Sequence, residues 1–148
     1  MRRIGLVWAG NPRHHFDAFR SVPLTTLLPL AEREGNAWFA IQKGPGATQL
    51  ADVALHAIGD ELSDFAATAA LIENLDLVIT VDTSVAHLAG ALGKPVWVLP
   101  APPPDWRWGK NRDDSVWYPL ARVFRQSMLG DWSDVLAPLQ GSLGETAP

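Results

Sequence analysis

The stretch DLVITVDTSVAHLAGALGKPVWVL, residues 76–99, limits the possible folds of this chain more than any other. It contains an apolar run, a polar turn, a segment of small and apolar residues, and a second apolar run. Uninterrupted apolar runs of this length are typical of strands buried on both faces, and two such strands joined by a helix form a unit of a parallel sheet. We therefore expect strands over 76–81 and 94–100 and a helix over 83–92.

The rest of the chain continues this alternation. Further strands are expected over 3–9, 37–42, 54–58 and 121–126, and helices over 23–34, 63–74 and 131–143, with one helical turn near 47–51. The pattern predicts an α/β fold, a Rossmann-like parallel sheet of about six strands with helices on both faces. Residues 1–148 are expected to form a single domain, with 143–148 as a frayed tail.

Polar residues mark where three of the helices should begin. Ser21 is a candidate cap for the helix that starts at Pro23, Ser63 for the helix over 63–74, and Asp82 for the helix over 83–92. Helical spacing predicts that the second of these helices buries one apolar face. The residues of that face are Phe65, Ala69 and Ile72.

The composition excludes several kinds of chemistry. The chain has no cysteine, so disulfides, thiolate zinc sites and cysteine nucleophiles are absent. Its net charge of −4 argues against a nucleic-acid partner held by bulk charge. No apolar run approaches the length of a membrane span, and the first residues lack the apolar core of a signal peptide. A cytoplasmic protein is expected.

Polar side chains gather where the strand over 76–81 gives way to its helix. Asp82 ends the strand, and Thr83, Ser84 and His87 follow, with Thr83 and His87 on one helical face. The first amides of a helix have no partner within it and favour an anion such as phosphate. A simple cap and a packed histidine would explain Asp82 and His87 separately, whereas a bound ligand explains the whole group.

The loop after the first strand, AGNPRHHFDAFRSVP, forms a second polar cluster that includes Asn11, Arg13, Arg20 and Ser21. Arg20 and Ser21 precede a helix, so a phosphate there would gain both guanidinium and amide donors. Solvated side chains in an exposed loop are the alternative. The two adjacent histidines of this loop should face different ways, so no metal site is expected.

Two further segments hold candidate ligand contacts. Lys43 follows the second strand next to two glycines, but the segment is neither a P-loop nor a dinucleotide fingerprint, and a solvated turn is an equal alternative. In the loop over 100–118, Trp106 could stack on a base or sugar and Arg107 could pair with a phosphate. Alternatively, this loop folds onto its own aromatic residues, which is the favoured interpretation for Trp117 and Tyr118.

Several of these segments together resemble a known family. They are IGLVWAGNPRHHFDAFRSVPL, IQKGP, LSDFAATAALIENLDLVITVDTSVAHLAGALGKPVWVLP and, further on, PDWRW, RDDSVWYP and RVFRQ. They are similar to the C-terminal glycosyltransferase domain of bacterial tetratricopeptide-repeat proteins, related to glycosyltransferase family 9, the heptosyltransferases. The resemblance implies the C-terminal half of a GT-B fold, in which two Rossmann-like halves face each other and this half binds the nucleotide-sugar donor.

The resemblance also implies roles for individual residues. The donor motif D-T-G-x-x-H of heptosyltransferases corresponds to Asp82, Thr83, Ser84 and His87, with serine in place of glycine. Arg20 corresponds to the basic residue of a K-x-x-P pattern. No counterpart of the half with the acceptor site and the catalytic carboxylate is found in these residues, so the catalytic residues are unknown. That half, or a repeat domain, is expected as a partner in cis or in trans.

The leading hypothesis is therefore the donor-binding half of a glycosyltransferase, inactive alone, with a nucleoside-diphosphate sugar as substrate and neither metal nor cofactor. The alternative is a non-catalytic binding or assembly module that retains the fold. An NAD-dependent oxidoreductase fits the fold class but lacks the glycine fingerprint. Exposed apolar surface near the strand ends is expected to allow homo-oligomers.

Overall fold

The computed structural model describes residues 1–50, 53 and 55–145. Within them, six strands form one parallel sheet in the order β3-β2-β1-β4-β5-β6. The strands are β1 (Arg2–Val7), β2 (Asn36–Ala40), β3 (His56–Ala57), β4 (Leu77–Val81), β5 (Val96–Leu99) and β6 (Ala121–Val123). The predicted Rossmann-like α/β fold is confirmed.

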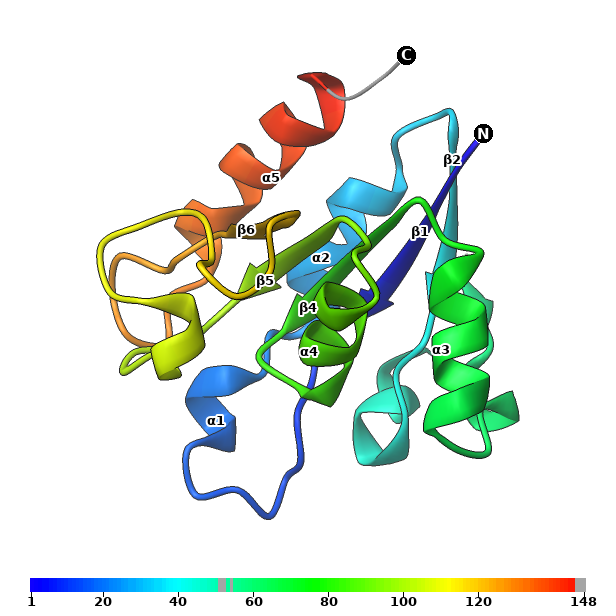
Figure 1. The fold of residues 1–148 in the computed structure, drawn as a ribbon, viewed down its shortest axis with the longest axis horizontal. Helices are drawn as coiled ribbons and strands as arrows, with labels where there is room; N and C mark the ends of the chain where they lie inside the picture. Colours follow the sequence, from blue (N-terminus) through cyan, green and yellow to red (C-terminus); the bar gives the residue numbers. More distant parts are fainter. Residues whose placement is uncertain (51–52, 54, 146–148) are drawn as a thin grey trace.

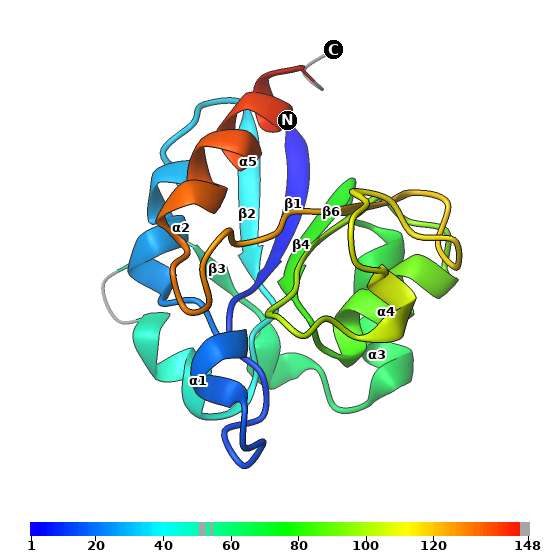
Figure 2. The same ribbon diagram turned by 90° about the vertical axis from the view of Figure 1, so that its left-hand side faces the viewer.

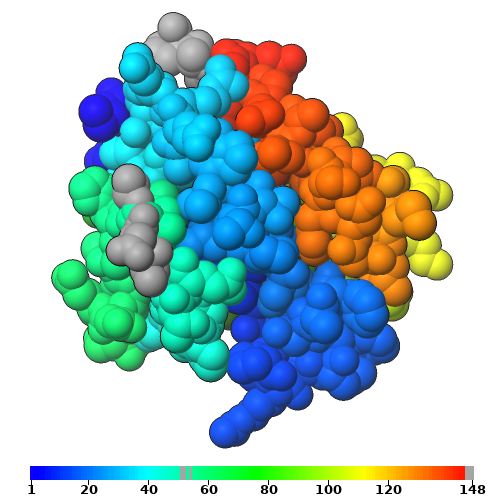
Figure 3. All heavy atoms as spheres, turned by 180° about the vertical axis from the view of Figure 1, so that it is seen from behind, coloured from blue at the N-terminus to red at the C-terminus, as the bar shows by residue number. Residues whose placement is uncertain are grey.

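Helices cover both faces of the sheet (Figures 1 and 2). On one face lie α2 (Leu24–Ala31) and α5 (Ser133–Glu145), which Figure 3 shows side by side, and on the other lie α3 (Phe65–Glu73) and α4 (Ser84–Ala91). Shorter helices occupy the connections: α1 (Asp17–Arg20), η1 (Gly44–Leu50), η2 (Gly59–Glu61) and η3 (Trp106–Trp108). No helix in the described part of the chain has both the length and the apolar character needed to cross a membrane.

The central strands are buried on both faces, as their apolar runs predicted. Every residue of β4 and β5 is buried. Ile79 and Trp97 belong to the core beneath α2 and α5, whereas Val78 and Val96 belong to the core beneath α3 and α4. Because alternate side chains enter opposite cores, the sheet is fixed from both sides and provides a rigid base for the connections at its carboxyl edge.

The start of α2 differs from the prediction. Ser21 does not cap this helix, because its hydroxyl donates to the carboxylate of Asp17 (3.0 Å) and accepts from the amide of Gly10 (3.0 Å). The amide of Leu24 instead donates to the side chain of Gln49 (2.9 Å). Ser21 therefore joins the two ends of the connection between β1 and α2. This connection also contains the short helix α1, which was not predicted.

The start of α3 also differs. Asp64, not Ser63, is the cap, and its carboxylate accepts the amide of a first-turn residue (2.8 Å). The predicted apolar face was wrong at Phe65, whose side chain is 64% exposed, while Thr68 and Ile72 are buried. Ile72 alone of the predicted face lies fully in the core, so the first turn of α3 is left to border the solvent.

The predicted carboxyl-terminal helix ended two residues too early. The last helix, α5, continues to Glu145, so 143–145 are helical rather than frayed, and 146–148 lie outside the described residues. The predicted strand over 54–58 is reduced to the two residues of β3, and the helical turn near 47–51 falls within η1; residues 51, 52 and 54 lie outside the description.

Both edge strands of the sheet are short. The strand β3 has two residues and β6 has three. The outer side of β6 is also partly paired, because Asp114 forms an antiparallel bridge with Arg122 and the amide of Val123 donates to the carbonyl of Asp113 (2.8 Å). The segment before β6 thus folds back along the edge of the sheet.

Candidate functional site

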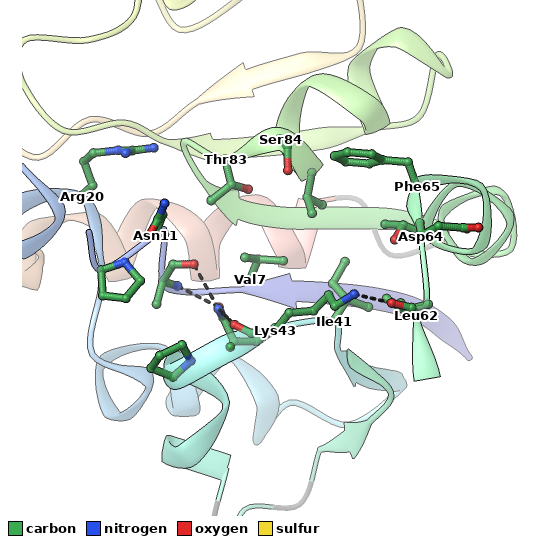
Figure 4. A pocket seen from close by; sticks show the side chains of 18 of the residues that line it. Val7, Asn11, Arg20, Ile41, Lys43, Leu62, Asp64, Phe65, Thr83 and Ser84 are labelled. Atoms are coloured by element: carbon green, nitrogen blue, oxygen red, sulfur yellow. Dashed lines mark hydrogen bonds between the residues drawn. The ribbon is translucent and has the colours of Figure 1, made fainter. Parts of the chain in front are cut away.

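A cavity of about 620 Å³ lies at the carboxyl edge of the sheet. The strand order reverses between β1 and β4, because the chain runs outward from β1 to β3 and then returns to β4. Ligands of parallel α/β sheets bind at such a reversal, outside the carboxyl ends of the strands. The lining comes from the segments that follow β1, β2 and β4, namely residues 9–12, 42–45 and 83–85, and from the start of α3 (Figure 4).

The floor of this first cavity is held by Gln42, which is buried. Its side-chain oxygen accepts the amides of Trp8 (3.0 Å) and Ala9 (2.9 Å), and its nitrogen donates to the carbonyls of Ala9 (3.1 Å) and Lys43 (2.9 Å). One side chain therefore joins the carboxyl ends of β1 and β2. Sequence reasoning missed Gln42, although a single amide at the end of an apolar run was a visible signal.

The first cavity has two different ends. Figure 4 shows Arg20 and Phe65 at opposite ends of the labelled lining, with Thr83 and Ser84 between them. Apolar side chains also contribute to the lining of this cavity, namely Val7, Ile41, Leu62 and Val85. The cavity thus offers a cation at one end, an exposed ring at the other, and apolar side chains elsewhere in its lining.

The N-terminus of α4 lies between these ends and has no side-chain cap among the described residues. Thr83 precedes the helix without capping it, so the prediction that Asp82 caps α4 was wrong. The hydroxyl of Thr83 instead pairs with the buried hydroxyl of Thr80 (3.1 Å), which donates its own proton to the carbonyl of Val81 (2.8 Å). The first amides of α4 therefore remain available to a ligand.

A second cavity, of about 510 Å³, is also lined by this helix start. Three residues, Arg20, Thr83 and Ser84, line both cavities. The second cavity is further lined by polar side chains and by the first residues after β5: His14, Asp82, His87, Asp105 and 101–103. The uncapped start of α4 and the guanidinium of Arg20 are therefore the common border of two adjoining spaces.

Arg20 and Asp82 are joined across this border, since the guanidinium donates to the main-chain carbonyl of Asp82. The carboxylate of Asp82 faces His87, with 3.6 Å between its Oδ1 and the Nε2 of the imidazole. The ring of His87 stacks on the buried Trp108 with 5.1 Å between centroids, and its Nδ1 lies 3.1 Å from the hydroxyl of Tyr118. These contacts give His87 a defined position beside the second cavity.

Asn11 and Lys43 lie in the lining of the first cavity, as the sequence suggested. The side chain of Asn11 also accepts the amide of Arg13 (2.9 Å). Lys43 donates to the carbonyl of Leu62, which links the end of β2 to the start of α3. Its ammonium is therefore not simply solvated, and a role in ligand binding stays a prediction.

Four residues that were predicted to contact the ligand line neither of these two cavities: Arg13, Ser21, Trp106 and Arg107. Arg107 pairs with the carboxylate of Asp105 (3.1 Å) and lies over the ring of Trp106, which meets Trp117 edge-on at 5.2 Å. Trp106, Arg107 and Trp108 line neither of these two cavities, and a ligand contact of Trp106 or Arg107 stays a prediction. The loop folds onto its own aromatic side chains, and Trp108 is fully buried.

No three histidine, aspartate or glutamate side chains of the described residues gather closely enough to hold a metal ion. Exposed apolar side chains do occur at the carboxyl edge, where Phe16 is 46% and Phe65 is 64% exposed. Self-association through such surface stays a prediction, which light scattering of the purified chain at high concentration can test.

Comparison with family models relates part of the chain to a known family. Residues 62–120 match the model of glycosyltransferase family 9 (heptosyltransferase). The matched segment contains α3, β4, α4 and β5, and with them Asp82, Thr83, Ser84 and His87, but it does not include Arg20. No curated protein matches the chain. The relation to tetratricopeptide-repeat proteins stays a prediction, and the similarity to glycosyltransferase family 9 rests on the segment that provides the uncapped start of α4.

Proposed function

We propose that this domain is the donor-binding half of a GT-B glycosyltransferase and binds a nucleoside-diphosphate sugar. One observation carries the proposal: two cavities meet at Arg20 and the N-terminus of α4, within or beside the segment that matches glycosyltransferase family 9. A nucleotide sugar has three chemically different parts, and the site has three matching regions.

The diphosphate occupies the common border of the two cavities. The first amides of α4 and the positive end of its dipole stabilise phosphate oxygens. A guanidinium carries five N–H donors, so Arg20 keeps donors for a phosphate beyond the bond to the carbonyl of Asp82. The hydroxyl of Ser84, where heptosyltransferases have glycine, adds one more donor at the same place.

The nucleoside occupies the first cavity. Its volume of about 620 Å³ is within the ordinary range of small-molecule sites. The exposed ring of Phe65 provides a stacking surface for the base, and the apolar side chains of Val7 and Ile41 line the floor. Lys43 lies beside this compartment and is the candidate contact to the ribose or the first phosphate.

The sugar occupies the second cavity. The carboxylate of Asp82 accepts hydrogen bonds from sugar hydroxyls, and His87 lies beside it. In the transfer step an acceptor hydroxyl loses its proton to a base and bonds to the sugar, while the bond between the sugar and the terminal phosphate oxygen breaks and negative charge develops on the departing diphosphate. Arg20 and the amides of α4 stabilise that charge, while a second domain brings the acceptor and the catalytic base. The domain alone is expected to bind without turnover.

Isothermal titration calorimetry of the purified domain tests this proposal. Uridine, adenosine and guanosine diphosphates are titrated first, followed by a nucleotide sugar of the base that binds best and by the nucleoside alone. We expect the diphosphate to bind at millimolar concentration or below, and Asp82→Ala to weaken the nucleotide sugar more than the free diphosphate. No binding at millimolar ligand, or binding that Arg20→Ala and Asp82→Ala both leave unchanged, overturns the proposal and favours the non-catalytic binding module.

A further inference from the structure

His87 is held from three sides in a way that the family match does not explain. Its ring stacks on Trp108 with an interplanar angle of 19°, its Nε2 faces Asp82, and its Nδ1 lies 3.1 Å from the hydroxyl of Tyr118. Tyr118 comes from the connection before β6, 31 residues further along the chain. Its contact with His87 is therefore made by the fold and not by helical spacing.

Tyr118 is itself fixed in place. Its ring packs against α4 at Gly90, where a Cβ atom would come within 2.4 Å of the tyrosine Cγ. Its carbonyl accepts the amide of Ala121 (3.0 Å) at the start of β6. Because both the ring and the backbone are anchored, the hydroxyl has little freedom to leave Nδ1.

The two partners of His87 determine which of its nitrogens carries the proton. A neutral imidazole has one N–H, and an ionised carboxylate only accepts hydrogen bonds. The proton is therefore favoured on Nε2, which faces Asp82, and the bare Nδ1 then accepts the hydroxyl proton of Tyr118. The 3.6 Å between Nε2 and Oδ1 of Asp82 is longer than a hydrogen bond, so this N–H is still open to a ligand.

We propose that Tyr118 is a positioning residue: with the acceptor-only carboxylate of Asp82 facing Nε2, the tyrosine hydroxyl at Nδ1 locks His87 in the Nε2–H form, so that the imidazole presents a hydrogen-bond donor to the second cavity. Resting on the proposed function, this assigns His87 the role of a donor to an oxygen of the sugar or of the terminal phosphate, and not that of a base. A base at this place would need a free nitrogen lone pair facing the cavity, whereas the lone pair of His87 is occupied by Tyr118.

Histidine ring ¹⁵N NMR at alkaline pH tests the lock without any ligand. Comparison with His87→Gln identifies the His87 signals. In the unmodified domain we expect a fully protonated Nε2 and a bare Nδ1. In Tyr118→Phe, which keeps the ring against Gly90, both signals should move toward an average of the two forms, while Trp117→Phe in the same loop should leave them unchanged. Signals of the unmodified domain that are already averaged, or that show the proton on Nδ1, overturn the proposal. Signals that do not change in Tyr118→Phe overturn it as well.

Ligand binding then tests whether the Nε2–H group of His87 donates a hydrogen bond to the ligand. Loss of one aligned hydrogen bond predicts that Tyr118→Phe weakens nucleotide-sugar binding by about fivefold. If Tyr118→Phe does not fold, the pair His87→Gln and His87→Asn replaces it, since the longer amide reaches the place of Nε2 and should bind several-fold tighter. Equal binding of that pair contradicts the donor role. A tautomer lock in a domain that binds no nucleotide would refute the proposed function and leave the lock intact.

Discussion

The guanidinium of Arg20 donates a hydrogen bond to the main-chain carbonyl of Asp82. This bond ties the connection after β1 to the turn after β4, the two segments that flank the reversal in strand order. The same guanidinium lines both cavities. Arg20 therefore shapes the site before any ligand arrives, and its removal should affect both the geometry of the helix start and the charge that a phosphate meets.

Arg20→Ala is expected to weaken binding of a nucleoside diphosphate by about 10- to 100-fold, which corresponds to the loss of about 1.5–3 kcal/mol from hydrogen bonds between charged groups. Arg20→Lys should recover part of this loss, because the charge remains while the forked geometry does not. Calorimetric titration measures both. Lys110→Ala, which removes the same charge from an exposed position in the loop over 100–118, is the matched control and should bind normally. Equal losses in Arg20→Ala and Lys110→Ala would show that only net charge matters.

Gln42→Leu should lower the free energy of unfolding by about 3 kcal/mol, because it leaves the buried amide of Trp8 and the partly buried amide of Ala9 without their acceptor. Gln42→Glu keeps an acceptor but replaces the NH₂ donor that serves the carbonyls of Ala9 and Lys43, so it should also destabilise the fold. Urea denaturation measures the change. Unfolding midpoints close to that of the unmodified domain for both variants would refute a structural role for this amide.

The sign of the stability change in Gly90→Ala shows whether helix propensity or tertiary packing dominates at this position. Alanine is favoured over glycine within a helix by about 1 kcal/mol. At Gly90, however, the added Cβ would meet the ring of Tyr118 at 2.4 Å, and overpacking of a core costs about 1–3 kcal/mol. We expect a net loss of stability, whereas Gly141→Ala in α5, where no atom of the described residues lies within 4 Å of the added Cβ, should stabilise the domain. Thermal unfolding gives both signs, and stabilisation by Gly90→Ala would contradict the packing of Tyr118.

The ion pair of Arg3 and Asp76 predicts a pH dependence. Hydrogen bonds from the guanidinium of Arg3, and then from its main-chain amide, lower the pKa of Asp76 from 3.8 to about 2. Because the folded-state pKa lies below the ordinary value, the pair stabilises the fold above pH ~4, and this contribution is lost as the pH falls toward ~2. Both side chains are more than a third exposed, so solvent screens the pair and its contribution to stability is small.

Urea denaturation of Asp76→Asn and of the unmodified domain checks this prediction. The gap between their stabilities should be constant near neutral pH, shrink as the pH falls through the acid range, and shrink also in about 0.5 M salt. A gap that is the same at all pH values would mean that the carboxylate charge of Asp76 has no part in stability.

The parallel sheet was predictable because its signal is local. The runs over 76–81 and 94–100 contain enough consecutive apolar residues to fill both faces of a strand, and few other structures can bury such runs. The place of Asp82, Thr83, Ser84 and His87 followed, because the carboxyl ends of parallel strands share one edge of the sheet.

The first turn of α3 was not predictable from spacing. Phe65 has the periodicity of a buried residue, but the segment after β2 leaves a cavity in front of it instead of a packed partner. The choice between Ser63 and Asp64 as cap is likewise decided by backbone angles that neighbouring elements impose. Propensity alone allows either residue.

Tertiary contacts also determine which polar side chains are bonded within the fold and which are available to a ligand. Gln42 looks like an ordinary turn residue until β1 and β2 are placed side by side, and only then do three of its four hydrogen bonds have partners, at Trp8 and Ala9. Arg107 was a candidate phosphate ligand because its charge was visible in the sequence, whereas its pairing with Asp105 depends on the turn of η3. Side-chain chemistry can be read from a sequence, but its availability to a ligand depends on the fold.

The short edge strands have a consequence for how copies of this domain meet. An exposed strand with free amides and carbonyls is a template on which another chain can add a strand, and this is a common route to aggregation. Here the two residues of β3 offer almost no such template, and the backbone at β6 is partly occupied by the segment around Asp114. Association of this domain should therefore proceed through side chains such as Phe16 and Phe65, in reversible contacts that a bound nucleotide would compete with, and not through extension of the sheet.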